Sequence, residues 1–208
     1  MEEPPVGRRR LTFRRLSGLD RSGPPPPQTQ RGQPLHIWTL PNAIGLLRFA
    51  LLPVFLVIEF SSDTGVEASA AVIYAVAAWT DYADGIAARL TGQYSRFGAL
   101  MDPVVDRLLV ICGVVACWYH ELLPRWALAV LIARELFMLV AGRQVLKQGR
   151  ELQINMVGRW AVWPVMSAVF LALCGVDTFA EVLLYLGLFL TLWATALYVR
   201  DARPSTSA

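Results

Sequence analysis

Four aspartates interrupt an otherwise apolar part of this chain, at a spacing that suggests chemistry. The stretch 81–106 reads DYADGIAARLTGQYSRFGALMDPVVD and holds Asp81 and Asp84, then Asp102 and Asp106. Residues three or four positions apart share one face of a helix, so each pair projects from one side of its own segment. Ionisable side chains within apolar, membrane-like segments are costly in free energy and mark functional sites. We therefore expect these four carboxylates to carry the function.

Carboxylates that share a pocket repel one another unless a cation neutralises them. A ligand set made only of oxygen favours hard divalent ions, such as magnesium, manganese or calcium, over zinc. Such a site could hold two ions, which would stabilise the attacking and the leaving oxygen of a displacement. Any one of these aspartates could equally be a solvated charge at a membrane boundary, but four of them in this register favour a metal site that handles phosphate.

Small residues and one arginine accompany the aspartates. Gly85 and Ala88 follow Asp84, and Gly98 lies one helical turn before Asp102. Small side chains at these positions allow close helix packing or the close approach of a ligand. Arg89 is placed to bind phosphate oxygens as a bidentate donor.

The composition indicates an integral membrane protein with one main domain. Of the 208 residues, 55% are hydrophobic and 17% are charged, and the mean hydropathy is +0.46. A soluble globular domain carries more charge and less apolar surface. The three cysteines are Cys112, Cys117 and Cys174, and they lie in apolar stretches without CxxC spacing. We expect them to be small buried residues rather than disulfides or zinc ligands.

Six apolar segments approach the length of a membrane-spanning helix. They lie at roughly 43–60, 68–88, 101–119, 124–146, 157–175 and 179–199. We expect an all-α fold of six transmembrane helices over residues 36–200, with a possible short interfacial helix just before the first span. Residues 1–35 are rich in arginine and proline and are expected to be a disordered tail, and residues 201–208 a second, short tail.

The distribution of lysine and arginine predicts the orientation. These residues are concentrated in the first tail, the connections at 89–100 and 143–159, and the C-terminus, whereas the opposite connections hold only Arg125. By the positive-inside rule, both termini are cytoplasmic in the cell membrane. The second and third spans are joined by a short connection on that side. Their four aspartates should therefore converge at the cytoplasmic end of a helix hairpin.

The same residues resemble a known family signature. The stretch 84–106 resembles, without a mismatch, the signature of the CDP-alcohol phosphatidyltransferases. It reads Asp84-Gly85-x-x-Ala88-Arg89, then eight residues, Gly98, three residues, Asp102, three residues and Asp106, and Asp81 fits the extended form of the signature. The resemblance implies a six-helix membrane enzyme, usually a homodimer, with a cytoplasmic active site. It would transfer a phosphatidyl group from CDP-diacylglycerol to an alcohol and release CMP.

The resemblance also implies roles for individual residues. The four aspartates would bind two divalent ions, Mg²⁺ or Mn²⁺, and Asp106 would also act as the general base. The CDP moiety would be bound by the small residues and the arginine of the signature: Gly85, Ala88, Arg89 and Gly98. The bilayer, the donor lipid and an alcohol are the expected partners, and nucleic acid is not.

The acceptor alcohol has to be inferred from other segments. PNAIGLLRFALLP at 41–53 and IARELF at 132–137 resemble phosphatidylglycerophosphate synthases, although Gly45 stands where those enzymes usually have threonine. The favoured acceptor is therefore glycerol 3-phosphate. Its phosphate needs cationic partners, and the candidates are Arg48, Arg134, Arg143 and Arg159. Each of these arginines could instead snorkel to the interface or simply follow the positive-inside rule.

Other functions fit the same pattern. A CMP-forming cardiolipin synthase using phosphatidylglycerol, and a phosphatidylinositol phosphate synthase, would share the signature. In a different class, a cation-coupled transporter would also use intramembrane carboxylates, but it would leave the register of glycine and arginine unexplained. A catalytically inactive scaffold is disfavoured because the signature is intact.

Overall fold

Six α-helices make up the part of the chain that the computed structural model describes, residues 36–147 and 156–202. Within these ranges the side chains of residues 89, 139, 142–147, 156–160 and 201–202 are not described. The helices are α2 (Leu40–Phe60), α3 (Ala68–Thr91), α4 (Arg96–Tyr119), α5 (Arg125–Lys147), α6 (Met156–Leu173) and α7 (Asp177–Ala202). The predicted all-helical fold is confirmed, and each helix covers most of one predicted segment.

The helix ends follow ordinary capping chemistry. Thr39 precedes α2 and its side chain accepts a hydrogen bond from the backbone N–H of Asn42; Pro41 sits in the first turn, where its missing N–H is not needed. Helix α3 ends at Gly92, whose φ of 66° lies in the left-handed region that glycine adopts readily. Residues 36–39 are not helical, so they do not form the interfacial helix expected before the first span.

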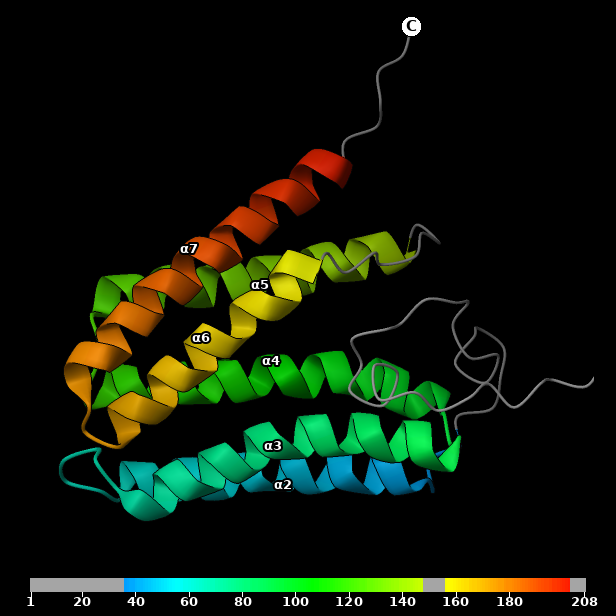
Figure 1. Cartoon of the computed structure of the whole chain (residues 1–208), viewed down its shortest axis with the longest axis horizontal. Coiled ribbons are helices and arrows are strands. Elements are labelled where there is room, and N and C mark those ends of the chain that lie inside the picture. Colours follow the sequence, from blue (N-terminus) through cyan, green and yellow to red (C-terminus); the bar gives the residue numbers. More distant parts are fainter. Residues whose placement is uncertain (1–35, 148–155, 203–208) are drawn as a thin grey trace, which may run out of the picture.

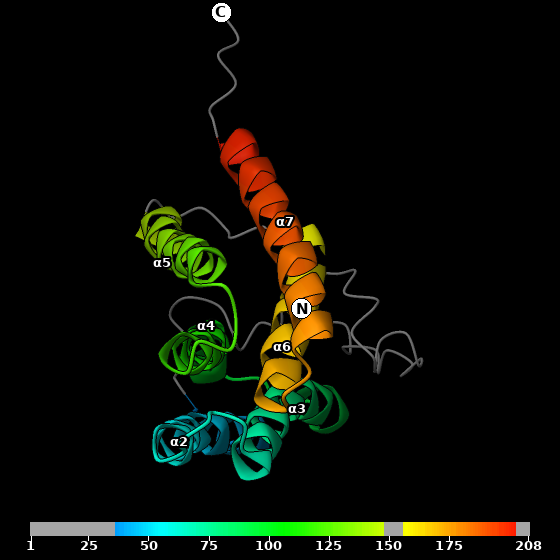
Figure 2. The same cartoon turned by 90° about the vertical axis from the view of Figure 1, so that its left-hand side faces the viewer.

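Helices α2, α3 and α4 lie together, and α5 lies against α4 (Figures 1 and 2). Helices α6 and α7 run at an angle to this group (Figure 1), with α7 in contact with α5 and α6. Helix α2 packs on both α3 and α4, and α6 packs along α7 and also touches α3 and α4. The α3–α4 connection lies at the same end of the bundle as the start of α2 (Figure 1). The two aspartate pairs therefore come to one end of the bundle, as the hairpin argument predicted.

The core is apolar and closely packed. Phe55, Tyr74 and Leu109 are each almost fully buried, one from each of α2, α3 and α4. Gly113 faces Tyr74 so closely that an added Cβ would lie 2.7 Å from its ring, which lets α3 and α4 approach. A small residue at a helix crossing permits this kind of contact. Packing of this density at the centre of the bundle fixes the relative positions of α2 and of the two helices that carry the aspartates, α3 and α4.

The outer surface is also apolar. Large side chains with more than half of their surface exposed include Val57, Trp79, Trp126, Phe179 and Phe189. Water-soluble monomers rarely expose so much contiguous apolar surface. Among the described residues, two helices are long and apolar enough to cross a membrane by length and composition, Leu40–Phe60 and Asp177–Arg200.

Candidate active site

The four aspartates lie on the facing helices α3 and α4, but they differ in exposure. The Asp84 side chain is 10% exposed, whereas those of Asp81 and Asp106 are 51% and 47% exposed. The cluster is therefore buried at Asp84 and accessible at its rim, at Asp81 and Asp106. A ligand could reach the rim without rearrangement of the core.

Arg48 of α2 lies at the centre of this cluster and has no exposed surface. Its Nη1 donates to Asp81 Oδ1 at 3.0 Å and to Asp106 Oδ1 at 2.6 Å, and its Nη2 donates to Asp84 Oδ2. One guanidinium thus bonds to three of the four carboxylates. The structure places this candidate acceptor arginine among the aspartates.

Thr80 orients the guanidinium. Its Oγ1 accepts from Arg48 Nε at 3.3 Å and donates to the carbonyl oxygen of Ala77 at 2.7 Å. The hydroxyl proton is used within α3, so the oxygen is free to accept from the arginine. Sequence analysis did not identify Thr80, although its place directly before Asp81 was a usable signal.

Gly45 brings α2 against the fourth aspartate. A Cβ at Gly45 would lie 3.7 Å from Asp102 Oδ1 and 2.8 Å from the Met101 methyl carbon. Gly45 and Arg48 are three residues apart and share one face of α2. That face therefore meets Asp102 through a glycine and the other three aspartates through an arginine.

A polar junction holds the start of α4 on the start of α2. Asn42 is 2% exposed; its Nδ2 donates to the carbonyl oxygens of His36 and Ile37, and its Oδ1 accepts from Ser95 Oγ at 2.8 Å. Ser95 also caps α4 by accepting from the Gly98 N–H at 2.9 Å. Gly98 is buried against this junction, so it has a packing role whether or not it also contacts CDP.

The donor set of the cluster fits a hard divalent cation. All four side chains are carboxylates, and three of them already direct oxygen atoms at one positive group, the Arg48 guanidinium. Among the described residues, no group of three or more His, Cys, Asp or Glu side chains is arranged to hold a metal ion as it stands. The cation that these carboxylates contact in the structure is the Arg48 guanidinium.

Comparison with known proteins agrees with the signature. The sequence profile of the CDP-alcohol phosphatidyltransferase family matches residues 38–193. The chain belongs to this family. The phosphatidyltransferase signature therefore coincides with the carboxylate cluster at the junction of α2, α3 and α4.

Relatives within the phosphatidyltransferase family carry two different names. The chain is 33% identical over 177 residues to the CMP-forming cardiolipin synthase of Streptomyces coelicolor, covering 82% of each chain. It is 32% identical over 146 residues to the CDP-diacylglycerol–glycerol-3-phosphate 3-phosphatidyltransferase of Bacillus subtilis, covering 64% of this chain and 75% of the relative. The Escherichia coli K12 protein of that name is 30% identical over 174 residues, covering 80% and 96%.

A second ionic network adjoins the phosphatidyltransferase signature. Glu135 of α5 is 3% exposed and accepts from both Arg134 and Arg107, the residue after Asp106. Arg134 Nε also donates to Thr195 Oγ1 of α7 at 3.0 Å. Arg134, a candidate for binding the acceptor phosphate, is thus paired with Glu135. Arg107 was not singled out from the sequence.

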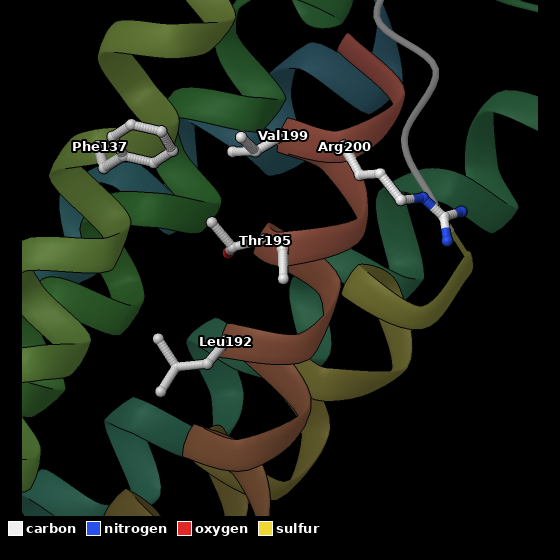
Figure 3. Close-up of a pocket in the computed structure, with 6 residues that line it drawn as sticks. Phe137, Leu192, Thr195, Val199 and Arg200 are labelled. Atoms are coloured by element: carbon white, nitrogen blue, oxygen red, sulfur yellow. The ribbon is translucent and has the colours of Figure 1, made fainter. Parts of the chain in front are cut away.

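A groove between α5 and α7 borders this network but not the signature. It has a volume of about 510 Å³, and Figure 3 shows Phe137 of α5 facing Leu192, Thr195 and Val199 of α7. Thr195 therefore lies both in the groove and on Arg134. None of the four aspartates lines the groove.

The remaining predicted site residues are placed less completely. Gly85 and Ala88 are partly buried on α3 beside Asp84. The side chains of Arg89, Arg143 and Arg159 lie outside the described part of the chain, so their predicted roles rest on the sequence.

Proposed function

We propose that this chain transfers the phosphatidyl group of CDP-diacylglycerol to glycerol 3-phosphate, producing phosphatidylglycerophosphate and CMP. The observation that carries the proposal is the gathering of the signature aspartates around one positive group at the junction of α2, α3 and α4, with Asp81 and Asp106 accessible at its rim. Family membership favours phosphatidyl transfer over cation transport. Two of the relatives above carry the name of a glycerol-3-phosphate phosphatidyltransferase.

In the proposed reaction Asp106 acts as the general base. It accepts the proton of the acceptor hydroxyl, and the resulting oxygen attacks the phosphorus that bears the diacylglycerol. The bond from this phosphorus to the CMP oxygen breaks, and CMP leaves with the electron pair. The partial exposure of the Asp106 side chain supports this role because a base must lie within hydrogen-bond reach of its substrate.

The divalent ions would be held by the four signature aspartates: Asp81, Asp84, Asp102 and Asp106. When bound, two Mg²⁺ or Mn²⁺ ions would supply positive charge that offsets the pyrophosphate and the departing CMP. Gly85, Ala88, Arg89 and Gly98 would bind the CDP moiety.

The arginines define the proposed acceptor site. Arg134 is held in α5 by Glu135 and Thr195, and together with Arg143 and Arg159 it would bind the acceptor phosphate. Arg48 is also a candidate, once its bonds to the aspartates are released. Planar guanidinium groups suit bidentate binding of phosphate.

A second candidate acceptor is phosphatidylglycerol. The Streptomyces coelicolor relative is named a CMP-forming cardiolipin synthase, and the match covers most of both chains. The reaction at the donor is the same, and the acceptor again presents a hydroxyl group near a phosphate. Only the acceptor pocket would differ.

We further propose that all six helices span the cell membrane, with both termini and the active site cytoplasmic. Residues 36–200 would form the catalytic domain, 1–35 and 201–208 cytoplasmic tails, and the protein a homodimer. The apolar outer surface and the two clearly membrane-capable helices support this arrangement. The positive-inside distribution of lysine and arginine supports the orientation.

CMP release by the purified protein tests the reaction. The protein in detergent would be given CDP-diacylglycerol, Mg²⁺ or Mn²⁺, and either glycerol 3-phosphate, phosphatidylglycerol or inositol phosphate. We expect metal-dependent CMP formation with glycerol 3-phosphate. CMP only with phosphatidylglycerol would establish the second candidate instead, and no CMP with any alcohol would contradict phosphatidyl transfer.

A further inference from the structure

The burial of Arg48 within the aspartate cluster has a consequence for metal binding. The guanidinium bonds to carboxylate oxygens of Asp81, Asp84 and Asp106, which belong to the ligand set of the proposed ions. It approaches from a third helix, α2, and its own side chain has no exposed surface. A divalent ion entering the cluster would meet a positive charge already bonded there.

We propose that Arg48 is a built-in counter-ion, which closes the aspartate cluster in the metal-free protein and which a divalent cation displaces when it binds. The inference rests on the proposed function for the assignment of the cation to these aspartates. It adds a role for Arg48 that is separate from binding the acceptor phosphate. Arg48 is here a positioning residue for the metal ligands.

The charges explain why both states are stable. Without metal, Arg48 is the cation that pairs with the buried Asp84 among the described residues. A buried carboxylate left without a partner would be costly in free energy. A divalent ion brings twice the charge and prefers carboxylate oxygen. A guanidinium and a divalent ion at the same oxygens repel each other, so one occupant excludes the other.

The neighbouring residues fit a displaceable arginine. Thr80 bonds only to Nε, through a 3.3 Å hydrogen bond, so among the described residues the two terminal nitrogens are held by the aspartates alone. Gly45, one turn earlier on the same face of α2, brings this helix close to Asp102, since a Cβ there would lie 3.7 Å from Asp102 Oδ1. Released terminal nitrogens would remain beside the cluster, where a substrate phosphate binds, and guanidinium groups bind phosphate well.

The first experiment measures Mn²⁺ binding to the full-length protein in detergent by electron paramagnetic resonance, without substrates. In Arg48→Gln we expect Mn²⁺ to bind at least about tenfold more tightly than in the wild type, equivalent to about 1.4 kcal/mol. In EDTA the same variant should melt roughly 6 to 12 °C lower, because the buried carboxylates lose their partner. Mn²⁺ should restore most of that loss.

Arg107→Gln is the matched control. It removes the same charge from the residue next to Asp106, but its guanidinium bonds to Glu135 rather than to the aspartates. If both variants tighten Mn²⁺ binding equally, Arg48 acts only through the local field and displacement is wrong. If Arg48→Gln does not fold, Arg48→Lys keeps the charge with fewer aligned donors, and its Mn²⁺ affinity should lie above that of the wild type.

A second experiment needs no substitution. Phenylglyoxal modifies accessible arginines, and mass spectrometry can follow the modification of Arg48 in the wild type. We expect little modification in EDTA and at least about threefold faster modification in Mn²⁺, a rough threshold for groups freed from charge-assisted bonds. An unchanged rate while Mn²⁺ is bound would overturn the proposal. Loss of CMP formation with all acceptors would instead contradict the proposed function and leave these binding results standing.

Discussion

Replacing Gly98 with alanine tests whether the junction between α2 and α4 is as tight as its contacts indicate. An added Cβ would lie 2.6 Å from Asn42 Oδ1 and 3.2 Å from Ser95 Oγ. The Asn42 amide cannot simply turn away, because its Nδ2 bonds to the carbonyl oxygens of His36 and Ile37 and its Oδ1 accepts from Ser95. The methyl group must therefore displace a buried, fully bonded amide.

The expected loss of stability follows from three contributions. Overpacking of a tight site costs about 1–3 kcal/mol, and loss of one buried hydrogen bond by Asn42 adds about 0.5–1.5 kcal/mol. The higher helix propensity of alanine returns at most about 1 kcal/mol. The net destabilisation of Gly98→Ala should be about 2 kcal/mol, which lowers the melting temperature by roughly 4 to 8 °C in a protein of this size.

Gly45→Ala is the matched control for this measurement. Its Cβ would also meet an atom at close range, 2.8 Å, but that atom is the terminal methyl carbon of Met101, which can move. We expect a change of about 0.5 kcal/mol or less, because methionine adapts to small changes in packing. Tryptophan fluorescence during thermal and SDS-induced unfolding would give both melting temperature and the free energy of unfolding.

Two results would refute the packing argument. The first is a Gly98→Ala variant as stable as the wild type. The second is equal destabilisation by Gly98→Ala and Gly45→Ala, since the two sites differ in whether the neighbour can yield. Combining Gly98→Ala with Asn42→Ala separates the contact from any general effect: the double variant should lose about 1 kcal/mol less than the two single losses together.

The remaining predictions concern other polar groups. Asp106→Asn should lower the rate of CMP release by about 10²–10⁴-fold, and full turnover would remove its assignment as the base. Glu135→Gln leaves Arg134 and Arg107 without their shared carboxylate, so the free energy of unfolding should fall by about 3 kcal/mol. The KM for the acceptor should rise as well. An unchanged KM would show that this ionic network does not contribute to acceptor binding. Glu59 is buried, and neither oxygen of its carboxylate has a hydrogen-bond partner, so Glu59→Gln should not lower the melting temperature. In contrast, His120→Ala should lower the melting temperature, because the His120 ring nitrogen Nε2 lies 2.9 Å from the backbone carbonyl oxygen of Glu59.

The helices were predictable because apolar segments of this chain end at recognisable signals. The segment expected at 68–88 became α3, Ala68–Thr91, which stops at Gly92. The segment expected from 101 begins earlier, at Arg96, because Ser95 caps a first turn that opens on a charged residue. Hydrophobicity therefore located the helices, while capping residues set their ends.

The partners of the charged residues were less predictable. Spacing shows which residues share one face of a helix, but it does not show which other helix that face meets. Arg48 was grouped with the acceptor arginines, because its distance from Asp81 along the chain gives no sign of contact. Arg134 was likewise grouped with the acceptor arginines, and the structure pairs it with Glu135, the residue adjacent in sequence.

Asp106 and Arg107 show how α4 connects the two ionic networks. Adjacent residues on a helix point in different directions, so Asp106 meets Arg48 of α2 while Arg107 meets Glu135 of α5. The carboxylate cluster thus involves α2, α3 and α4, whereas Arg134, one of the candidate acceptor residues, is held by Glu135 of α5 and Thr195 of α7. A change of acceptor could then arise in α5 and α7 without altering the carboxylates. The relatives named above differ in this respect, because one name specifies glycerol 3-phosphate and the other specifies a cardiolipin product.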